Sequence, residues 1–285
     1  MTLRDRIPWV TGSFYESTAS SLKNQLDWCF THKVGPGSLP EEKGEVLSSR
    51  RAVSIISPHA GYIYSGPVAA HGYFNLAHEP VPDIVAILGP NHTGEGAGVS
   101  VWGDGSWETP LGKLQLEGDA ARGLQELGVA EEDQQAHIHE HSIEVQLPFL
   151  QYIYKKSFRI LPICMMLQDC ETSVELGTAL ATVLAEKSAV LVASTDFSHY
   201  EPYKVAYAKD SLVSEAILAM DAGKVEQTVA KNGISMCGPG PVMAAITASS
   251  KLGAKTCRKL CYATSGDTSG SKAEVVGYGS FMMSR

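Results

Sequence analysis

Three short, largely apolar runs constrain the fold of this chain more than any other feature. They cover residues 54–57, 84–88 and 189–194, and each gives way to a polar segment. Runs of this length, closed by proline or glycine, are typical of strands buried on both faces of a parallel sheet. Helical patterns occupy the segments between them, which is the alternation of an α/β fold. We therefore expect one three-layer domain over residues 1–285, with a mostly parallel central sheet and helices on both faces.

The remaining elements follow from periodicity and from breakers. Helices are expected over residues 20–30, 66–74, 119–127, 142–154, 170–186, 203–220, 225–231 and 241–252, with Asp169 as the N-cap of the fifth. Further strands are expected over residues 113–116, 158–165, 259–264 and 275–282. Residues 36–49 and 264–271 are predicted to be loops, residues 94–105 loop or edge structure, and residues 107–112 a turn.

The composition excludes some classes of partner. A formal net charge of -8 and a pI near 5.6 give an acidic surface, which attracts neither nucleic acid nor an anionic membrane. No apolar run approaches the roughly 20 residues that a membrane helix needs. The six cysteines form no paired framework, so we expect reduced thiols and a cytoplasmic protein.

Polar side chains follow all three apolar runs. His59 and His92 each come shortly after a proline, and Asp196 and His199 follow the third run. Because the carboxyl ends of parallel strands meet at one edge, where ligands bind, we expect a polar and metal-binding cluster there. The prolines fix the backbone, so the two imidazoles leave the sheet at defined angles. Asp196 and His199 are three residues apart, and one helical turn would place them on a common side.

Cys237 is the fourth candidate in the chain. It stands shortly before Pro241, which is well placed as the first residue of a helix. The positive end of the helix dipole is expected to lower the pKa of the Cys237 thiol and to favour the thiolate that binds metal. The other cysteines lie in apolar or helical patterns and are interpreted as small packing residues.

A histidine-rich segment lies between residues 137 and 141. Its spacing differs from the helical His-Glu-x-x-His of zinc proteases. His141 fits the start of a helix in a solvated loop as well as it fits a catalytic role. His137 and His139 are interpreted as exposed to solvent.

The motifs resemble, in order, those of the Memo family (mediator of cell motility). The matching segments are Thr11-Gly12-Ser13-Phe14-Tyr15, Pro58-His59-Ala60-Gly61-Tyr62, Leu88-Gly89-Pro90-Asn91-His92, His141-Ser142-Ile143-Glu144, Ser194-Thr195-Asp196-Phe197-Ser198-His199 and Cys237-Gly238. The resemblance covers nearly the whole chain. It implies a fold like that of class III extradiol dioxygenases, which hold non-haem Fe(II) with two histidines and one glutamate.

The resemblance also implies roles for single residues. His59 and His92 match the two histidine ligands, and Cys237 falls where the carboxylate ligand would be. His199 matches the acid/base histidine, while Asp196 and His141 would line the same pocket. Fe(II) is the implied metal. The thiolate departs from the family's ring-cleaving relatives and shifts the preference of the site toward softer ions such as Cu or Zn.

Three hypotheses follow from these residues. The first is a mononuclear iron or copper oxidoreductase in which His199 and Asp196 move protons. The second is a binding module that recognises a peptide, a protein or a small partner through the former active-site cleft, with the metal lost or incidental. The third is a zinc hydrolase, for which Glu144 or Asp196 would be the general base. The oligomeric state is left open by the sequence.

Overall fold

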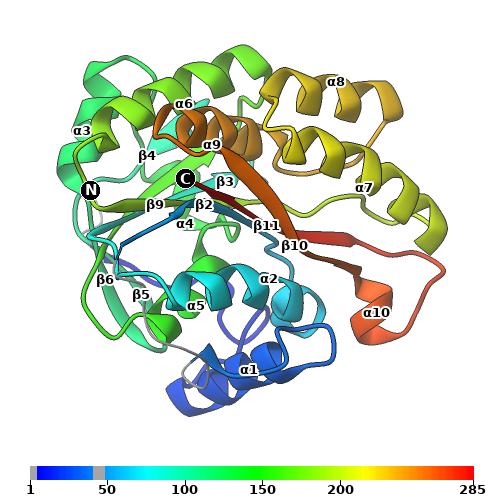
Figure 1. The fold of residues 1–285 in the computed structure, drawn as a ribbon. Coiled ribbons are helices and arrows are strands. Elements are labelled where there is room, and N and C mark those ends of the chain that lie inside the picture. The colour runs from blue at the N-terminus through cyan, green and yellow to red at the C-terminus, as the bar shows by residue number, and fades with distance from the viewer. Residues whose placement is uncertain (1–4, 41–48) are drawn as a thin grey trace.

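One large sheet runs through the molecule, and its strands follow the apolar runs of the sequence. The computed structural model describes residues 5–40 and 49–285. The main path of the sheet is β1-β5-β6-β8-β3-β9-β2-β11-β10, and β4 and β7 lie beside it (Figure 1). The strands are β1 (Asp5–Arg6), β2 (Ala52–Ser57), β3 (Ile84–Pro90), β4 (Val99–Val101), β5 (Ser106–Thr109), β6 (Gly112–Leu116), β7 (Glu131–Glu132), β8 (Arg159–Met165), β9 (Ala189–Ser194), β10 (Thr256–Thr264) and β11 (Gly277–Ser284).

The centre of the sheet is parallel, as predicted. Strands β8, β3, β9 and β2 are neighbours and pair in parallel, and every residue of β2 and β3 is buried. Antiparallel pairs occur toward the periphery, where β11 joins β2 and β10 joins β11. Strands that are covered on both faces need apolar residues at every position, which is why the runs do not alternate.

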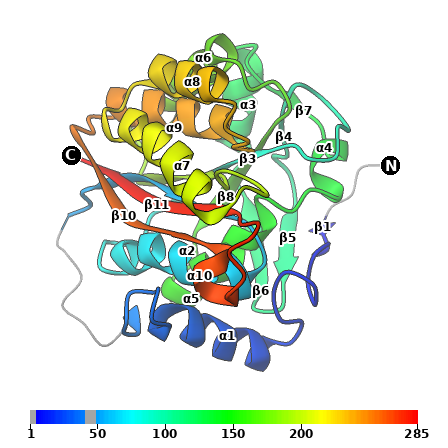
Figure 2. The same ribbon diagram turned by 90° about the vertical axis from the view of Figure 1, so that its right-hand side faces the viewer.

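Helices cover both faces of the sheet (Figure 2). One layer holds α3 (Gly118–Glu126), α6 (Cys170–Leu184), α7 (Tyr203–Leu218), α8 (Ala222–Asn232) and α9 (Pro239–Lys251), and the other holds α1 (Ala19–Thr31), α2 (Tyr62–Ala77), α5 (Leu147–Ile153) and α10 (Ser265–Ser269). Each layer packs on its own apolar cluster, and the buried strands contribute side chains to both. The mixed α/β fold with a large central sheet and helices on both faces is thus confirmed.

Several local expectations were wrong. The helix expected over residues 142–154 is divided into the 3-10 turn η2 (Glu144–Gln146) and α5, with Pro148 in the first turn of α5. The predicted turn contains β5 and the predicted loop at residues 264–271 contains α10, whereas the loop or edge structure expected over residues 94–105 is right, because it includes the short strand β4 beside the main path of the sheet. The short α4 (Gln135–Ile138) was not expected. Of the loop predicted at residues 36–49, residues 41–48 lie outside the described residues.

Across residues 5–40 and 49–285, the helices are too short or too polar to cross a membrane.

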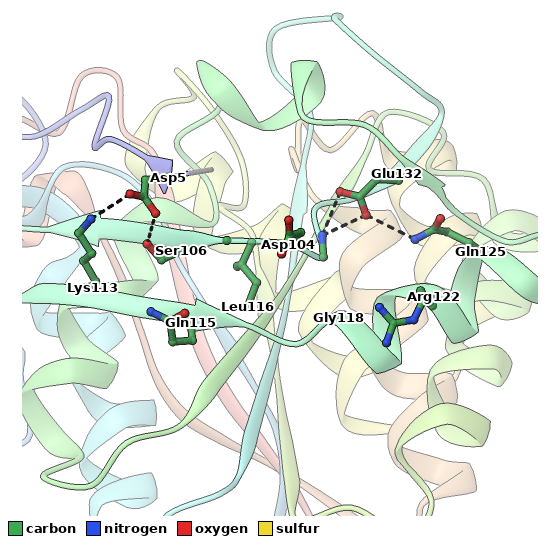
Figure 3. A pocket seen from close by; sticks show the side chains of 12 residues that line it. Asp5, Asp104, Ser106, Lys113, Gln115, Leu116, Gly118, Arg122, Gln125 and Glu132 are labelled. Carbon is green, nitrogen blue, oxygen red and sulfur yellow. Dashed lines mark hydrogen bonds and ion pairs between the residues drawn. The ribbon is translucent and has the colours of Figure 1, made fainter. Parts of the chain in front are cut away.

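A polar pocket of about 750 Å³ lies beside the β5–β6 hairpin (Figure 3). Two of its carboxylates are engaged within the chain. Asp5 accepts hydrogen bonds from Ser106 and Lys113, and Glu132 accepts from the amide of Gly103. The lining comes from β1, β5, β6, α3 and the neighbouring loops rather than from the strand ends that carry the candidate histidines.

Candidate metal centre

Three neighbouring strands deliver polar residues to one edge of the sheet. His59 follows β2, His92 follows β3, and Asp196 follows β9, which pairs in parallel with both other strands. The predicted convergence at the carboxyl edge therefore occurs, because parallel strands end on the same side.

His141 joins the two predicted histidines. The ligand atoms of His59, His92 and His141 all lie within 4.8 Å of one another. The ring centroids are 5.2 Å apart for His59 and His92, 5.4 Å for His59 and His141, and 4.7 Å for His92 and His141. Imidazole nitrogens that share one ion lie roughly 3–4 Å apart, because each metal–nitrogen bond is about 2.1 Å long. The cluster therefore could hold one metal ion after small side-chain movements.

A serine behind the ring sets the orientation of His59. Nδ1 of His59 lies 2.8 Å from Oγ of Ser194. The Ser194 hydroxyl donates to the carbonyl of Ser142 at 2.7 Å, so its oxygen accepts from His59. Gln146 donates to the same oxygen at 2.9 Å. The ring proton of His59 therefore belongs on Nδ1, and the lone pair that can bind a metal belongs on Nε2.

A single carboxylate lies behind the other two imidazoles. Oε1 of Glu140 lies 2.9 Å from Nδ1 of His92 and 3.3 Å from Nδ1 of His141. Because a carboxylate only accepts hydrogen bonds, the ring of His92 carries its proton on Nδ1 and presents Nε2, whereas the contact of Glu140 with the ring of His141 is a close approach without a hydrogen bond. Burial raises the pKa of Glu140, but the hydrogen bond from His92 and the neighbouring imidazoles outweigh burial and bring the pKa to about 2. The sequence assigned no role to Glu140, although its position beside His141 was a usable signal.

Two of the imidazoles are neutral at physiological pH. Burial lowers the pKa of His59 well below its ordinary value, and the neighbouring histidines lower it further. Burial also lowers the pKa of His141, to about 4, although the charge of Glu140 opposes this shift. Metals bind the neutral form of imidazole, so neither ring has to lose a proton before a metal binds.

Cys237 contacts the cluster from the side of His59. Its Sγ lies 3.2 Å from Nε2 of His59 and accepts from the amide of Asp196 at 3.2 Å. The mutually close group is made by the three histidines, so His141 rather than Cys237 is its third member. Cys237 stands two residues before α9, as expected, but the predicted lowering of its pKa is wrong. Burial and the carboxylate of Asp196 raise the pKa of the thiol, and the helix end does not overcome them.

Asp196 and His199 lie in a segment without regular secondary structure rather than in a helical turn. Asp196 is buried, and its Oδ1 accepts from the amide of His59 at 2.8 Å. Burial raises the pKa of Asp196 to about 6, although hydrogen bonds from the His59 and Ala60 amides oppose the shift. His199 is partly exposed, and its Nδ1 donates to the carbonyl of Ser235 at 2.7 Å, which leaves the lone pair on Nε2. Both residues can therefore hold or accept a proton beside the cluster.

Glu144 is a structural anchor rather than a base. It is fully buried, and its two oxygens accept from Arg6, from the hydroxyl of Tyr15, and from the amides of Trp9 and Val10, at distances of 2.7 to 3.0 Å. Four donors occupy both oxygens, so the role of general base suggested for Glu144 is contradicted by its surroundings.

His137 and His139 were both expected to be exposed to solvent, and the structure confirms this for His139 only. The side chain of His139 is 42% exposed and lies against the ring of Trp9. His137 is fully buried instead, and its Nε2 lies 3.2 Å from Oγ of Ser100. Nothing in the local sequence distinguishes these two histidines, because the burial of His137 depends on packing against Trp102 and Trp107.

Comparisons with known proteins agree over nearly the whole chain. A family model described as Memo-like protein matches residues 6–282. The chain is 45% identical over 284 residues to a MEMO1 family protein of Methanopyrus kandleri, which covers 99% of each chain. It is also 45% identical over 276 residues to a MEMO1 family protein of Methanothermobacter thermautotrophicus, covering 96% of this chain and 98% of that protein.

Among solved structures, an uncharacterized protein of Escherichia coli K12 is similar in fold. The TM-score is 0.55 and the sequence identity is 14%, with 81% of this chain and 99% of that chain covered. At this level of identity the likeness shows the fold alone.

Proposed function

This chain belongs to the Memo family, and we propose that it is a mononuclear metal-binding oxidoreductase with a metal centre at His59, His92, His141 and Cys237. One observation carries the proposal. Nδ1 of His59 and Nδ1 of His92 each have a hydrogen-bond acceptor, so their Nε2 atoms are left for a site that they share with the neighbouring ring of His141. Lone pairs that converge on one point repel one another, and a cation relieves that repulsion.

The donor set fits a transition metal. Neutral imidazoles suit Fe, Cu and Zn, and a thiolate adds affinity for the softer ions. The raised pKa of Cys237 means that its thiol proton faces Nε2 of His59 until a metal replaces it. Metal binding is therefore coupled to the release of one proton from the thiol. We favour Fe(II), with Cu as the next candidate.

Bound Fe(II) or Cu would supply one-electron and oxygen chemistry to the site. The residues beside it provide proton transfer. Asp196 holds a proton below a pKa of about 6 and also fixes the backbone of His59. Nε2 of His199 can accept a proton from a bound ligand, because Nδ1 is tied to Ser235. The ligand we propose is a small molecule or a peptide that enters from the exposed His92 side.

The zinc hydrolase is less well supported. Its general base would have to be Asp196, because Glu144 has no accepting position left. The binding module takes the metal to be lost or incidental, whereas the hydrogen bonds of His59 and His92 leave their Nε2 atoms for a metal. Both alternatives predict a different metal content from the oxidoreductase.

The test is elemental analysis of protein purified without oxygen and without an affinity tag. We expect about one iron or copper ion per chain, and a spectral change when oxygen is admitted. Spectroscopically silent zinc would instead support the hydrolase. Folded protein that carries no metal, and takes up neither Fe(II), Cu nor Zn on titration, would leave only the binding module.

A matched pair of variants tests whether the sulfur of Cys237 binds the metal. Cys237→Ser should abolish the bound metal, because the replacement hydroxyl is a poor ligand for soft ions. Cys261→Ser changes another half-buried cysteine, in β10, and should leave the metal content unchanged. Equal metal content in both variants would remove Cys237 from the metal centre.

A further inference from the structure

The carboxylate of Glu140 contacts two of the three histidines in the cluster. Its side chain is 1% exposed. Oε1 faces Nδ1 of His92 and Nδ1 of His141, and it also accepts from the amides of His141 and Ser142, both at 2.8 Å. Oε2 accepts from the amide of His92 at 2.5 Å. One carboxylate thus contacts both the backbone and the ring of two separate candidate ligands.

Only a carboxylate can satisfy this arrangement. Every group that faces Glu140 in these contacts is an N–H donor, on both of its oxygens. A glutamine of the same shape has one accepting and one donating end, so either orientation directs its NH₂ at a donor. If the NH₂ faces Nδ1 of His92, the ring must move its proton to Nε2 to accept. That tautomer directs an N–H, rather than a lone pair, into the cluster.

The segment that carries Glu140 is held in place from behind. The guanidinium of Arg6 donates from Nη2 to the carbonyl of Glu140 at 2.7 Å and from Nε to the carbonyl of His137 at 2.8 Å. Ser142 donates to the carbonyl of Pro90, at the end of β3. The carboxylate is therefore fixed relative to the strand that presents His92.

From this geometry we infer that Glu140 is the positioning residue of the metal centre, which sets the tautomer of His92 and holds the backbone of His141. The inference rests on the proposed function, since it assigns a role relative to metal ligands. His59 is outside its influence, because Ser194 sets that ring. Loss of Glu140 should therefore affect two ligands and spare the third.

The experiment compares Glu140→Gln with the wild type by metal titration and by nitrogen NMR of the histidine rings. Affinity for Co(II) and Zn(II), measured in competition with a chromophoric chelator, should fall roughly 10- to 100-fold. In the metal-free variant the fraction of His92 rings with the proton on Nε2 should rise, because one orientation of the amide directs its NH₂ at Nδ1, while His59 keeps its proton on Nδ1. If Glu140 had only a structural role, its loss would lower stability. It would not change the tautomer of His92 while leaving that of His59 the same.

Glu95→Gln is the matched control, because Glu95 is a nearby exposed glutamate whose Oε2 lies 3.8 Å from Nδ1 of His139. It should leave both the metal affinity and the tautomers unchanged. The wild type provides a test that does not depend on the folding of any variant: its metal-free His92 should carry the proton on Nδ1, and a proton on Nε2 would overturn the inference. Unchanged affinity in folded Glu140→Gln would also overturn it, whereas a wild type that binds no metal would overturn the proposed function alone.

Discussion

The buried ion pair behind the histidine segment allows a sharp test of how the fold supports the site. Arg6 and Glu144 are 2% and 0% exposed, and Nη1 of Arg6 lies 2.7 Å from Oε2 of Glu144. The guanidinium also lies over the ring of Trp107, with 4.3 Å between its carbon and the ring centroid. Arg6→Met keeps most of the side-chain length but leaves the carboxylate of Glu144 buried without its cation.

Removal of one partner from a buried ion pair costs about 3–5 kcal/mol. Glu144 keeps three other donors in this variant, so we expect the lower end, about 3 kcal/mol. For chains of this size, about 3 kcal/mol corresponds to a fall in Tm of roughly 6–12 °C.

Denaturant unfolding, followed by far-UV circular dichroism, measures these differences. Arg122→Met is the control, since Arg122 pairs with Asp119 on an exposed turn of α3, where both side chains are more than 60% exposed. It should cost less than about 0.5 kcal/mol. The reasoning would be refuted if Arg6→Met cost no more than this control.

Three further expectations concern single positions. Gly89→Ala should destabilise the protein by about 1–3 kcal/mol and weaken metal binding, because a Cβ there would lie 2.4 Å from Oγ of Ser142, next to His141. Gly223→Ala in α8, where the nearest atom would be 3.6 Å away, is its control in thermal melting and should be neutral or stabilising. Tyr200→Gly should raise the unfolding free energy by about 0.5–1 kcal/mol, since Tyr200 has a φ of 56° and a side chain that is 74% exposed; a lower midpoint in denaturant would contradict this. Burial lowers the pKa of His137 to about 3, so the stability it contributes is complete above pH 6.5 and is lost as the pH falls from 6.5 toward 3. The loss is at most about 1.4 kcal/mol per pH unit, and His137→Gln should show a shallower decline than the wild type when unfolding is measured across that range.

Short-range patterns in the sequence predicted the elements that carry the site. Strands β2, β3 and β9 were visible as apolar runs, and the polar residues after them were predicted to meet because parallel strands share a carboxyl edge. The pairing of β9 with both β2 and β3 bears this out for His59, His92 and Asp196. Local periodicity was less informative where tertiary contacts decide the conformation, as in the divided helix around Pro148.

Such short-range patterns could not predict the residues that support the site. Glu140 meets His92 across 48 positions of the chain, and Arg6 meets Glu144 across 138. The pKa of Cys237 was predicted from its helix end alone, whereas burial and Asp196 dominate it in the folded chain.

The sequence by itself determined where strands β2, β3 and β9 form, where they end and which side chains stand at those ends, because these depend on neighbouring residues along the chain. Only the tertiary structure decided that His141 joins His59 and His92, that Glu140 orients the ring of His92, and that Cys237 holds its proton. Those properties depend on distance and on burial in three dimensions, and the linear order of residues records neither.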